Sequence, residues 1–225
     1  MKQPKLKFRI SVPMRTLAVM SIILTAIALL TMAFNKNQSF AKIDKKIELT
    51  ANVENDGVNQ DSTESVKAFM KVYQVLMSPR CMNCHPSGDV PLQGDDNHLH
   101  NMLPQRGKDG KGVYAMKCNN CHQPTNIAGL NTPPGDPNWH LPPANMKMVF
   151  QGRTAYQLAK QIMDRKQNGN KTRQQLIAHA DDGLVLAGWN PGEGRTVPPI
   201  SHEEFKKAWI TWITTGAYAP NPKAK

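Results

Sequence analysis

Hydrophobic residues recur at helical intervals in four segments of the chain, and each segment predicts an amphipathic helix. The first helix is expected to begin with a capping box at Asp61 and to end before Pro79. The others are expected to begin at Thr154, Thr172 and Ser201, each followed three residues later by Gln or Glu. The expected apolar stripe of the last helix consists of Phe205, Ala208, Trp209, Trp212 and Ile213.

The stretch from 86 to 152 lacks this periodicity. It contains nine prolines and eight glycines in 67 residues. Loops of this length are uncommon in compact domains unless they serve a function or are disordered. A large apolar cofactor enclosed by these loops would supply the core that the side chains do not. Gly169 is the expected end of the helix that starts at Thr154, and a Pro/Gly-rich loop at Trp189–Gly192 precedes the last helix. No strand of useful length is expected, so the pattern predicts an all-α, loop-rich domain.

The chain opens with the order of residues that is typical of an export signal. Five Lys and Arg residues and no acid lie in residues 1–15, and Leu17–Phe34 carries no charge. A short polar stretch then ends in Ser39-Phe40-Ala41, which resembles a cleavage site. Because eighteen uncharged residues approach the length of a membrane span, retention as an anchor is the alternative.

We therefore expect residues 1–41 to form a signal peptide or N-terminal anchor, residues 42–60 a polar linker, and residues 61–225 one domain. The domain is expected in the periplasm, either soluble or tethered to the inner membrane by residues 17–34. No other contact with a membrane is expected.

The formal net charge of +11 is smaller when the exported part is considered alone. Six of the 28 basic residues and none of the 17 acidic residues lie in residues 1–41, which leaves +5. A charge of this size does not indicate a nucleic-acid partner. It would suit the electrostatic steering of an acidic redox partner, or it is simply a soluble charged surface.

Two short segments carry the recognisable chemistry: Cys81-Met82-Asn83-Cys84-His85 and Cys118-Asn119-Asn120-Cys121-His122. Two thiols three residues apart lie on one face of a helical turn, so both can bind the vinyl groups of one haem. The histidine that follows can bind the haem iron. All four cysteines of the chain belong to these motifs. The sequence therefore predicts two covalent c-type haems, attached at Cys81, Cys84, Cys118 and Cys121, with His85 and His122 as axial ligands.

Only 32 residues separate His85 from Cys118, so the two haems are expected to lie close together in one domain. This arrangement favours an electron-transfer protein over an enzyme. A haem enzyme of peroxidase type with one open iron site is an alternative. A zinc-bound interaction module is another, although 33 residues between Cys84 and Cys118 exceed the usual spacing of zinc ribbons.

The sequence offers several side chains for the distal positions of the two irons. Met146 follows the stiff segment Pro142-Pro143, which can present a thioether, and His100 would share a face with His98 in an extended segment. We expect Met146 on one iron and His100 or another methionine on the second, since methionine raises the reduction potential relative to histidine. The other candidates are His140, His179, His202, Met102, Met116 and Met148.

At both motifs the chain resembles the c-type cytochromes, and the helices that flank them are similar to the helical pair of the small haem-c fold. Ser78–Pro86, Gln93–Asp96 and the later tryptophan loops resemble bacterial cytochrome-like proteins labelled isoquinoline 1-oxidoreductase subunits, over most of residues 62–220. This resemblance implies a cytochrome c-like domain that accepts electrons from a molybdenum hydroxylase acting on aldehydes or N-heterocycles.

The chain also departs from the c-type cytochromes in one respect. Its two motifs are too close for two complete haem units, so the distal ligands of that family do not carry over simply. The chain does not resemble the dihaem peroxidases, in which the motifs lie much farther apart.

Overall fold

The computed structural model describes residues 58–222, so the expected signal or anchor segment and residues 42–57 of the expected linker lie outside it. Its helices are α2 (Val58–Leu76), α3 (Pro79–Met82), α4 (Ala155–Met163), α5 (Arg173–His179), α6 (Gly183–Ala187) and α7 (His202–Thr214), with a 3-10 turn at Cys118–Asn120. Two short antiparallel hairpins pair β1 (Leu92–Gln93) with β2 (His98–Leu99) and β3 (Gly112–Val113) with β4 (Met116–Lys117). This part is rich in helices and loops, as predicted, and none of its helices has the length and hydrophobicity of a bilayer crossing.

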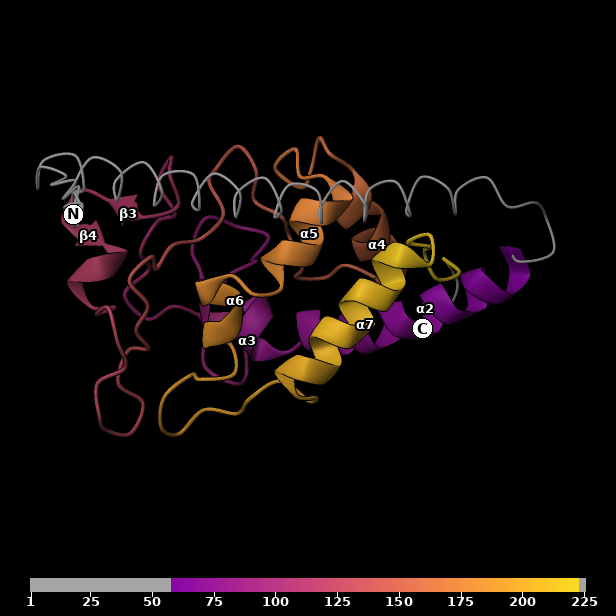
Figure 1. Ribbon diagram of the computed structural model, residues 1–225. Helices are drawn as coiled ribbons and strands as arrows, with labels where there is room; N and C mark the ends of the chain where they lie inside the picture. The colour runs from indigo at the N-terminus through magenta and orange to yellow at the C-terminus, as the bar shows by residue number, and fades with distance from the viewer. Residues whose placement is uncertain (1–57, 223–225) are drawn as a thin grey trace, which may run out of the picture. The chain divides into compact units, whose positions relative to one another are not determined.

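The main helix pair is α2 and α7, and α4 and α5 pack beside it (Figure 1). Phe69 of α2 and Trp212 of α7 are fully buried, with ring centroids 4.5 Å apart. The Ser65 hydroxyl joins the same helices, because it donates to Trp212 O at 3.1 Å and accepts from Tyr218 N at 3.0 Å. The predicted stripe of α7 is confirmed, since all five of its residues are buried: Phe205, Ala208, Trp209, Trp212 and Ile213.

Three helices begin at capping boxes that the sequence predicted. In each, the hydroxyl of the cap residue accepts a hydrogen bond from the backbone N–H three residues on, and the side chain there accepts from the N–H of the cap. These bonds satisfy N–H groups that have no partner inside the helix. The pairs are Thr154–Gln157, Thr172–Gln175 and Ser201–Glu204.

The expected start of the first helix is wrong, and one helix was not predicted. α2 already begins at Val58, so Asp61 lies within the helix and does not cap it. Residues 58–60 contain neither glycine nor proline, so nothing in them prevents an earlier start. α6 has only five residues, which is too short for hydrophobic periodicity to reveal it.

The end of α4 also differs from the prediction. α4 stops at Met163, whereas the sequence predicted a helix continuing to Gly169. The carboxylate of Asp164 accepts hydrogen bonds from the Lys166 N–H at 2.9 Å and from the Gln167 side chain at 2.7 Å. Such local bonds offer the backbone an alternative to the next helical turn, and a loop therefore begins here.

The stretch from 86 to 152 has little apolar core of its own. Apart from proline, its buried hydrophobic side chains are Leu92, Leu141 and Phe150. Seven of the ten large hydrophobic side chains exposed in the described part lie in this stretch: Leu99, Met102, Leu103, Tyr114, Met116, Ile127 and Leu130. In Figure 1 its loops extend to the left of the helices, with β3 and β4 farthest out. Hydrophobic burial among side chains therefore contributes little to holding these loops in place.

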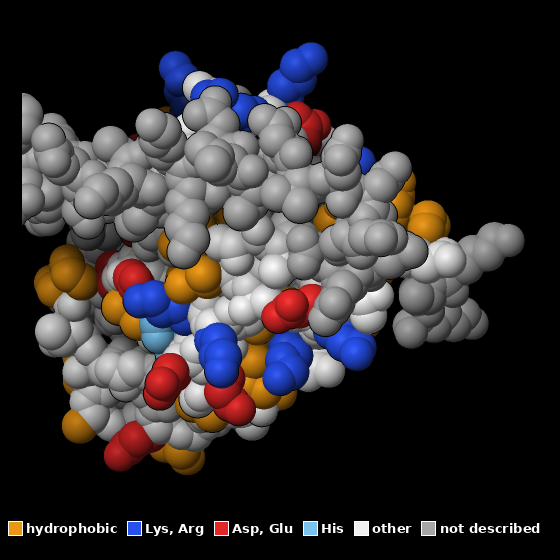
Figure 2. Space-filling view, turned by 45° about the vertical axis from the view of Figure 1, so that its right-hand side comes forward, with side chains coloured by type: hydrophobic (Ala, Val, Ile, Leu, Met, Phe, Trp, Pro, Cys, Tyr) orange, Lys and Arg blue, Asp and Glu red, His pale blue; other side chains and the backbone are white. Residues whose placement is uncertain are grey.

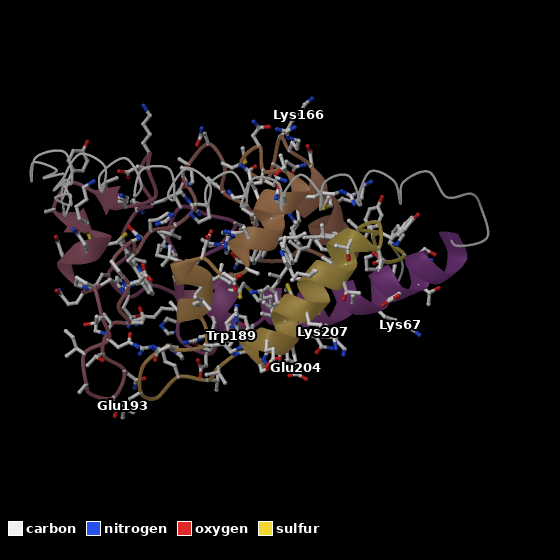
Figure 3. The ribbon with its side chains drawn as sticks, in the orientation of Figure 1. Lys67, Lys166, Trp189, Glu193, Glu204 and Lys207 are labelled. Carbon is white, nitrogen blue, oxygen red and sulfur yellow. The ribbon has the colours of Figure 1, made fainter. Side chains whose placement is uncertain are left out.

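We expect Trp212→Ala to lower the free energy of unfolding by about 3–5 kcal/mol, because it removes a fully buried ring between α2 and α7. Urea unfolding followed by circular dichroism would measure the change. Lys207→Ala is the matched control, since Lys207 lies exposed on the same helix (Figure 3), and it should change the free energy by less than about 0.5 kcal/mol. Equal effects of the two substitutions would contradict this packing.

Candidate functional site

The first motif lies on a helical turn that starts at Pro79. Proline suits the beginning of a helix, where its missing N–H breaks no hydrogen bond. Hydrogen bonds then continue past the end of α3: the Cys84 N–H donates to Cys81 O at 3.2 Å and the His85 N–H donates to Met82 O at 3.0 Å. Both cysteines are free thiols, one helical turn apart, as their spacing predicted.

The imidazole of His85 is held by two residues that lie far from it in the sequence. Its Nδ1 lies 2.7 Å from Met148 O, and its ring stacks on Phe150 with centroids 3.9 Å apart and planes 12° apart. Because a carbonyl oxygen only accepts, Nδ1 carries the proton and Nε2 keeps its lone pair. Burial lowers the pKa of His85 to about 4, so the ring is neutral at pH 7. This is the state in which histidine binds a metal.

The second motif repeats this arrangement with different residues. The Cys121 and His122 N–H groups both donate to Cys118 O, at 3.2 and 2.9 Å. His122 Nδ1 lies 2.7 Å from Pro134 O, and its ring stacks on Trp139 with centroids 4.0 Å apart and planes 8° apart. Burial lowers the pKa of His122 as well. Each motif histidine therefore has a carbonyl on Nδ1, an aromatic ring against its face and a lone pair on Nε2.

The thiols of the first motif are held in the neutral form. Burial raises the pKa of Cys81 to about 12 and that of Cys84 to about 11. A charge on Cys118 contributes to the shift at Cys84, so the two motifs lie within electrostatic range of each other. A thioether bond to haem leaves sulfur neutral, whereas zinc binds thiolates. Among residues 58–222, no three His, Cys, Asp or Glu side chains converge as a metal-binding group.

Two buried guanidinium groups flank the first motif. Arg106 is fully buried, and it donates from Nη1 to Pro142 O at 2.6 Å and from Nη2 to Gly88 O at 3.1 Å. Its Nε has no hydrogen-bond partner, although it lies 3.4 Å from Asp89 Oδ1 as an ion pair. Burial lowers the pKa of Arg106, and a charge on Cys84 would raise it, which places this cation beside the motif.

Arg80 directly precedes Cys81, and its side chain is only 6% exposed. Its Nη2 donates to Gly94 O at 3.2 Å and pairs with the Asp95 carboxylate, but its Nε is buried without a hydrogen-bond partner. Unpaired buried donors are rare and point to a missing acceptor. The residues present therefore fit a c-type haem: paired neutral thiols, one neutral imidazole for each pair, and cations near the first pair that could balance haem carboxylates.

The loop between α6 and α7 joins the surroundings of both motifs. Arg195 Nη2 donates to Asn131 O at 2.9 Å, and Asn131 N donates to Glu193 O at 3.0 Å, beyond the second motif. The Thr196 N–H donates to Asp95 at 3.1 Å, and Asp95 pairs with Arg80 at the first motif. In Figure 3, Trp189 lies at the base of this loop beside α7, and Glu193 lies at its tip.

The two predicted distal ligands lie in different surroundings. A charge on His100 contributes to the low pKa of His122, so His100 lies within electrostatic range of the second motif. The Met146 side chain points to the loop after α4, since a Cβ added at Gly169 would lie 3.9 Å from its Cγ. Met146 also lines a surface pocket there with Gln161 and Lys166.

Sequence reasoning missed the residues that support the two motifs. Phe150 and Trp139 stack on the motif histidines, and Arg80 and Arg106 supply buried charge. A signal existed for the aromatic residues, since they stand in loops that the sequence already assigned to cofactor binding. No periodic pattern marks the two arginines, because each is positioned by backbone carbonyls of distant loops.

Comparison with known proteins adds no relative: no family model matches the chain, and neither a curated protein nor a solved structure matches it.

We expect Cys121 in the folded, haem-free chain to react with iodoacetamide at least about tenfold faster than Cys81 or Cys84. Cys121 is exposed, whereas the other two thiols have raised pKa values and the thiolate is the reactive form. Peptide mass spectrometry after timed labelling would measure the rates. Labelling in urea is the control and should make the three rates similar, and similar rates without urea would contradict the burial of the first motif.

Proposed function

We propose that this protein is an exported electron-transfer protein with two covalent c-type haems, one on Cys81 and Cys84 and the other on Cys118 and Cys121. One observation carries the proposal. Two separate Cys-x-x-Cys-His turns each hold the histidine with a carbonyl at Nδ1 and a stacked aromatic ring, which leaves Nε2 for an iron. When bound, each haem would supply an iron that accepts and releases one electron.

The side chains have distinct roles in this proposal. Met148 O and Pro134 O fix the tautomer and orientation of the two histidines, and such outer partners tune the bound metal. Phe150 covers the His85 ring, and burial around it excludes water. Close spacing of the two motifs, indicated by the interaction of Cys84 with Cys118, suits electron transfer between the haems.

His100 is the proposed distal ligand of the iron bound by His122. Its electrostatic interaction with His122 supports this assignment over the other distal candidates of the second motif. The His100 N–H donates to Pro91 O at 3.0 Å just after β2, which fixes the backbone of this residue. Met146 remains a prediction from the sequence alone.

An external redox protein would exchange electrons with the haems. The resemblance of the motif regions to subunits of molybdenum hydroxylases makes such an enzyme the proposed donor, and the two haems could take up the two electrons of one substrate oxidation. On the face in Figure 2, acidic and basic side chains are interspersed over the lower half, so this face presents no field of one sign to a partner. The alternative is a peroxidase-type enzyme, which would require an iron with an open coordination position.

Expression with a haem-c maturation system should give two covalent haems per chain. A pyridine haemochrome spectrum and the mass of the denatured protein would measure this number. The double variant Cys118→Ala/Cys121→Ala should keep one haem, and the reciprocal variant Cys81→Ala/Cys84→Ala is its matched control and should also keep one. A chain with no covalent haem, and zinc in its place, would overturn the proposed function.

The reduced wild-type protein should not bind carbon monoxide, because both irons of an electron carrier have two protein ligands. His100→Ala should open one iron and add about one equivalent of carbon monoxide per chain, seen as a shift of the Soret band. His140→Ala is the control, and it should leave both irons closed. Ready binding of carbon monoxide by the wild type would favour the peroxidase alternative.

A further inference from the structure

His179 is an imidazole with the same features as the motif histidines. It is the last residue of α5, its side chain is 41% exposed, and its Nδ1 contacts the Asp182 carboxylate. An ionised carboxylate only accepts, so the proton lies on Nδ1 and the lone pair on Nε2 is free. A carboxylate behind Nδ1 is a frequent partner of histidines that bind metals.

The use of Asp182 in this contact is itself unusual. Asp182 is the N-cap residue of α6, where aspartate normally accepts a hydrogen bond from the backbone of the first turn. Here its side chain makes no such cap bond and contacts His179 instead. The chain thus directs a carboxylate to an imidazole at the expense of a helix cap.

The segment that carries His179 leads to α6, which lies between the surroundings of the two motifs. At its start, a Cβ added at Gly183 would lie 3.3 Å from Asp136 Oδ2, near the loop that supports His122. At its end, a Cβ added at Gly188 would lie 3.7 Å from the Arg80 Cβ, next to Cys81. Figure 1 shows α6 and α3 side by side, below the end of α5.

His179 also lies within electrostatic range of His85, since its charge contributes to the low pKa of that residue. On its Nδ1 side and on one face, the His85 ring is already occupied by Met148 O and Phe150. Each motif histidine therefore has one further histidine as an electrostatic neighbour: His179 for His85, and His100 for His122.

The neighbouring His202 has a different role. Its Nε2 lies 2.8 Å from Ala180 O, and its ring packs edge-on against Trp189 with centroids 4.9 Å apart. The nitrogen that would bind an iron is thus already bonded to the residue that follows His179. His202 holds the turn in place and leaves His179 as the free imidazole at this position.

We propose that Nε2 of His179 is the second axial ligand of the iron bound by His85. The proposal rests on the proposed function, because it requires a haem at Cys81 and Cys84. Asp182 is the positioning residue that keeps Nε2 available. The first haem would then have two histidine ligands, in place of the methionine that the sequence favoured for one iron, and its reduction potential would be lower than with methionine.

The experiment compares the ferric holoprotein with His179→Met and His179→Ala, using near-infrared magnetic circular dichroism and carbon monoxide titration. The wild type should show two haems with paired histidine ligands and no far-red band of methionine ligation. His179→Met should create this band for one haem and raise one midpoint potential. His179→Ala should bind about one equivalent of carbon monoxide after reduction.

His202→Gln is the matched control, because glutamine can still donate to Ala180 O, and both haems should keep their spectra. An unchanged spectrum in His179→Ala would overturn the assignment, and so would a wild-type far-red band that Met146→Ala removes. The pyridine haemochrome count separates this outcome from failure of the proposed function: two haems with the wrong ligand refute only His179, whereas no haem refutes both.

Discussion

The loop-rich half of this domain depends on one buried cation, the guanidinium of Arg106. Its two Nη atoms donate to carbonyls of Gly88 and Pro142, which are 54 positions apart along the chain. Its own backbone donates to Asp89 O and accepts from Gly112 N. A residue with few hydrophobic neighbours thus gathers three loops around the first motif. Burying the charge disfavours it, as the lowered pKa indicates, and this cost is accepted where side-chain packing cannot define the fold.

The helices could be predicted from the sequence because local chemistry determines them. The capping boxes at Thr154, Thr172 and Ser201 and the stripe from Phe205 to Ile213 are properties of neighbouring residues, and all are present. Helix ends were predicted less well, as at Asp164, because a side chain that bonds its own backbone competes with the next turn.

The candidate site divides in the same way. The helical turns of both motifs followed from the spacing of their cysteines. The supports of the histidines did not, because Met148 O and Pro134 O are backbone atoms, and any residue can supply a carbonyl. Arg80 and Arg106 were also missed, since ion pairs and hydrogen bonds between distant loops leave no periodic trace in a sequence. The Asp182–His179 contact is short in sequence, but only the placement of α6 gives it meaning.

The two motifs differ in how far the protein encloses them. The first is surrounded by Arg80, Arg106 and Phe150, whereas the second has an exposed Cys121 and lies among exposed hydrophobic side chains. For the proposed function, this asymmetry gives the second haem the shorter path to an external protein. The first haem would be the inner member of the pair.

The backbone contact between the first motif and Phe150 has a consequence for biosynthesis. The carbonyl of His85 accepts from the N–H groups of Phe150 and Gln151, at 2.9 and 3.3 Å, so a chain emerging from its N-terminus completes the wall of this site only after some 65 further residues have appeared. Closing so long a loop is slow compared with forming one helical turn. During that interval the cysteine pair stays accessible to an attachment enzyme, and later arrival of the 148–151 segment seals the finished product.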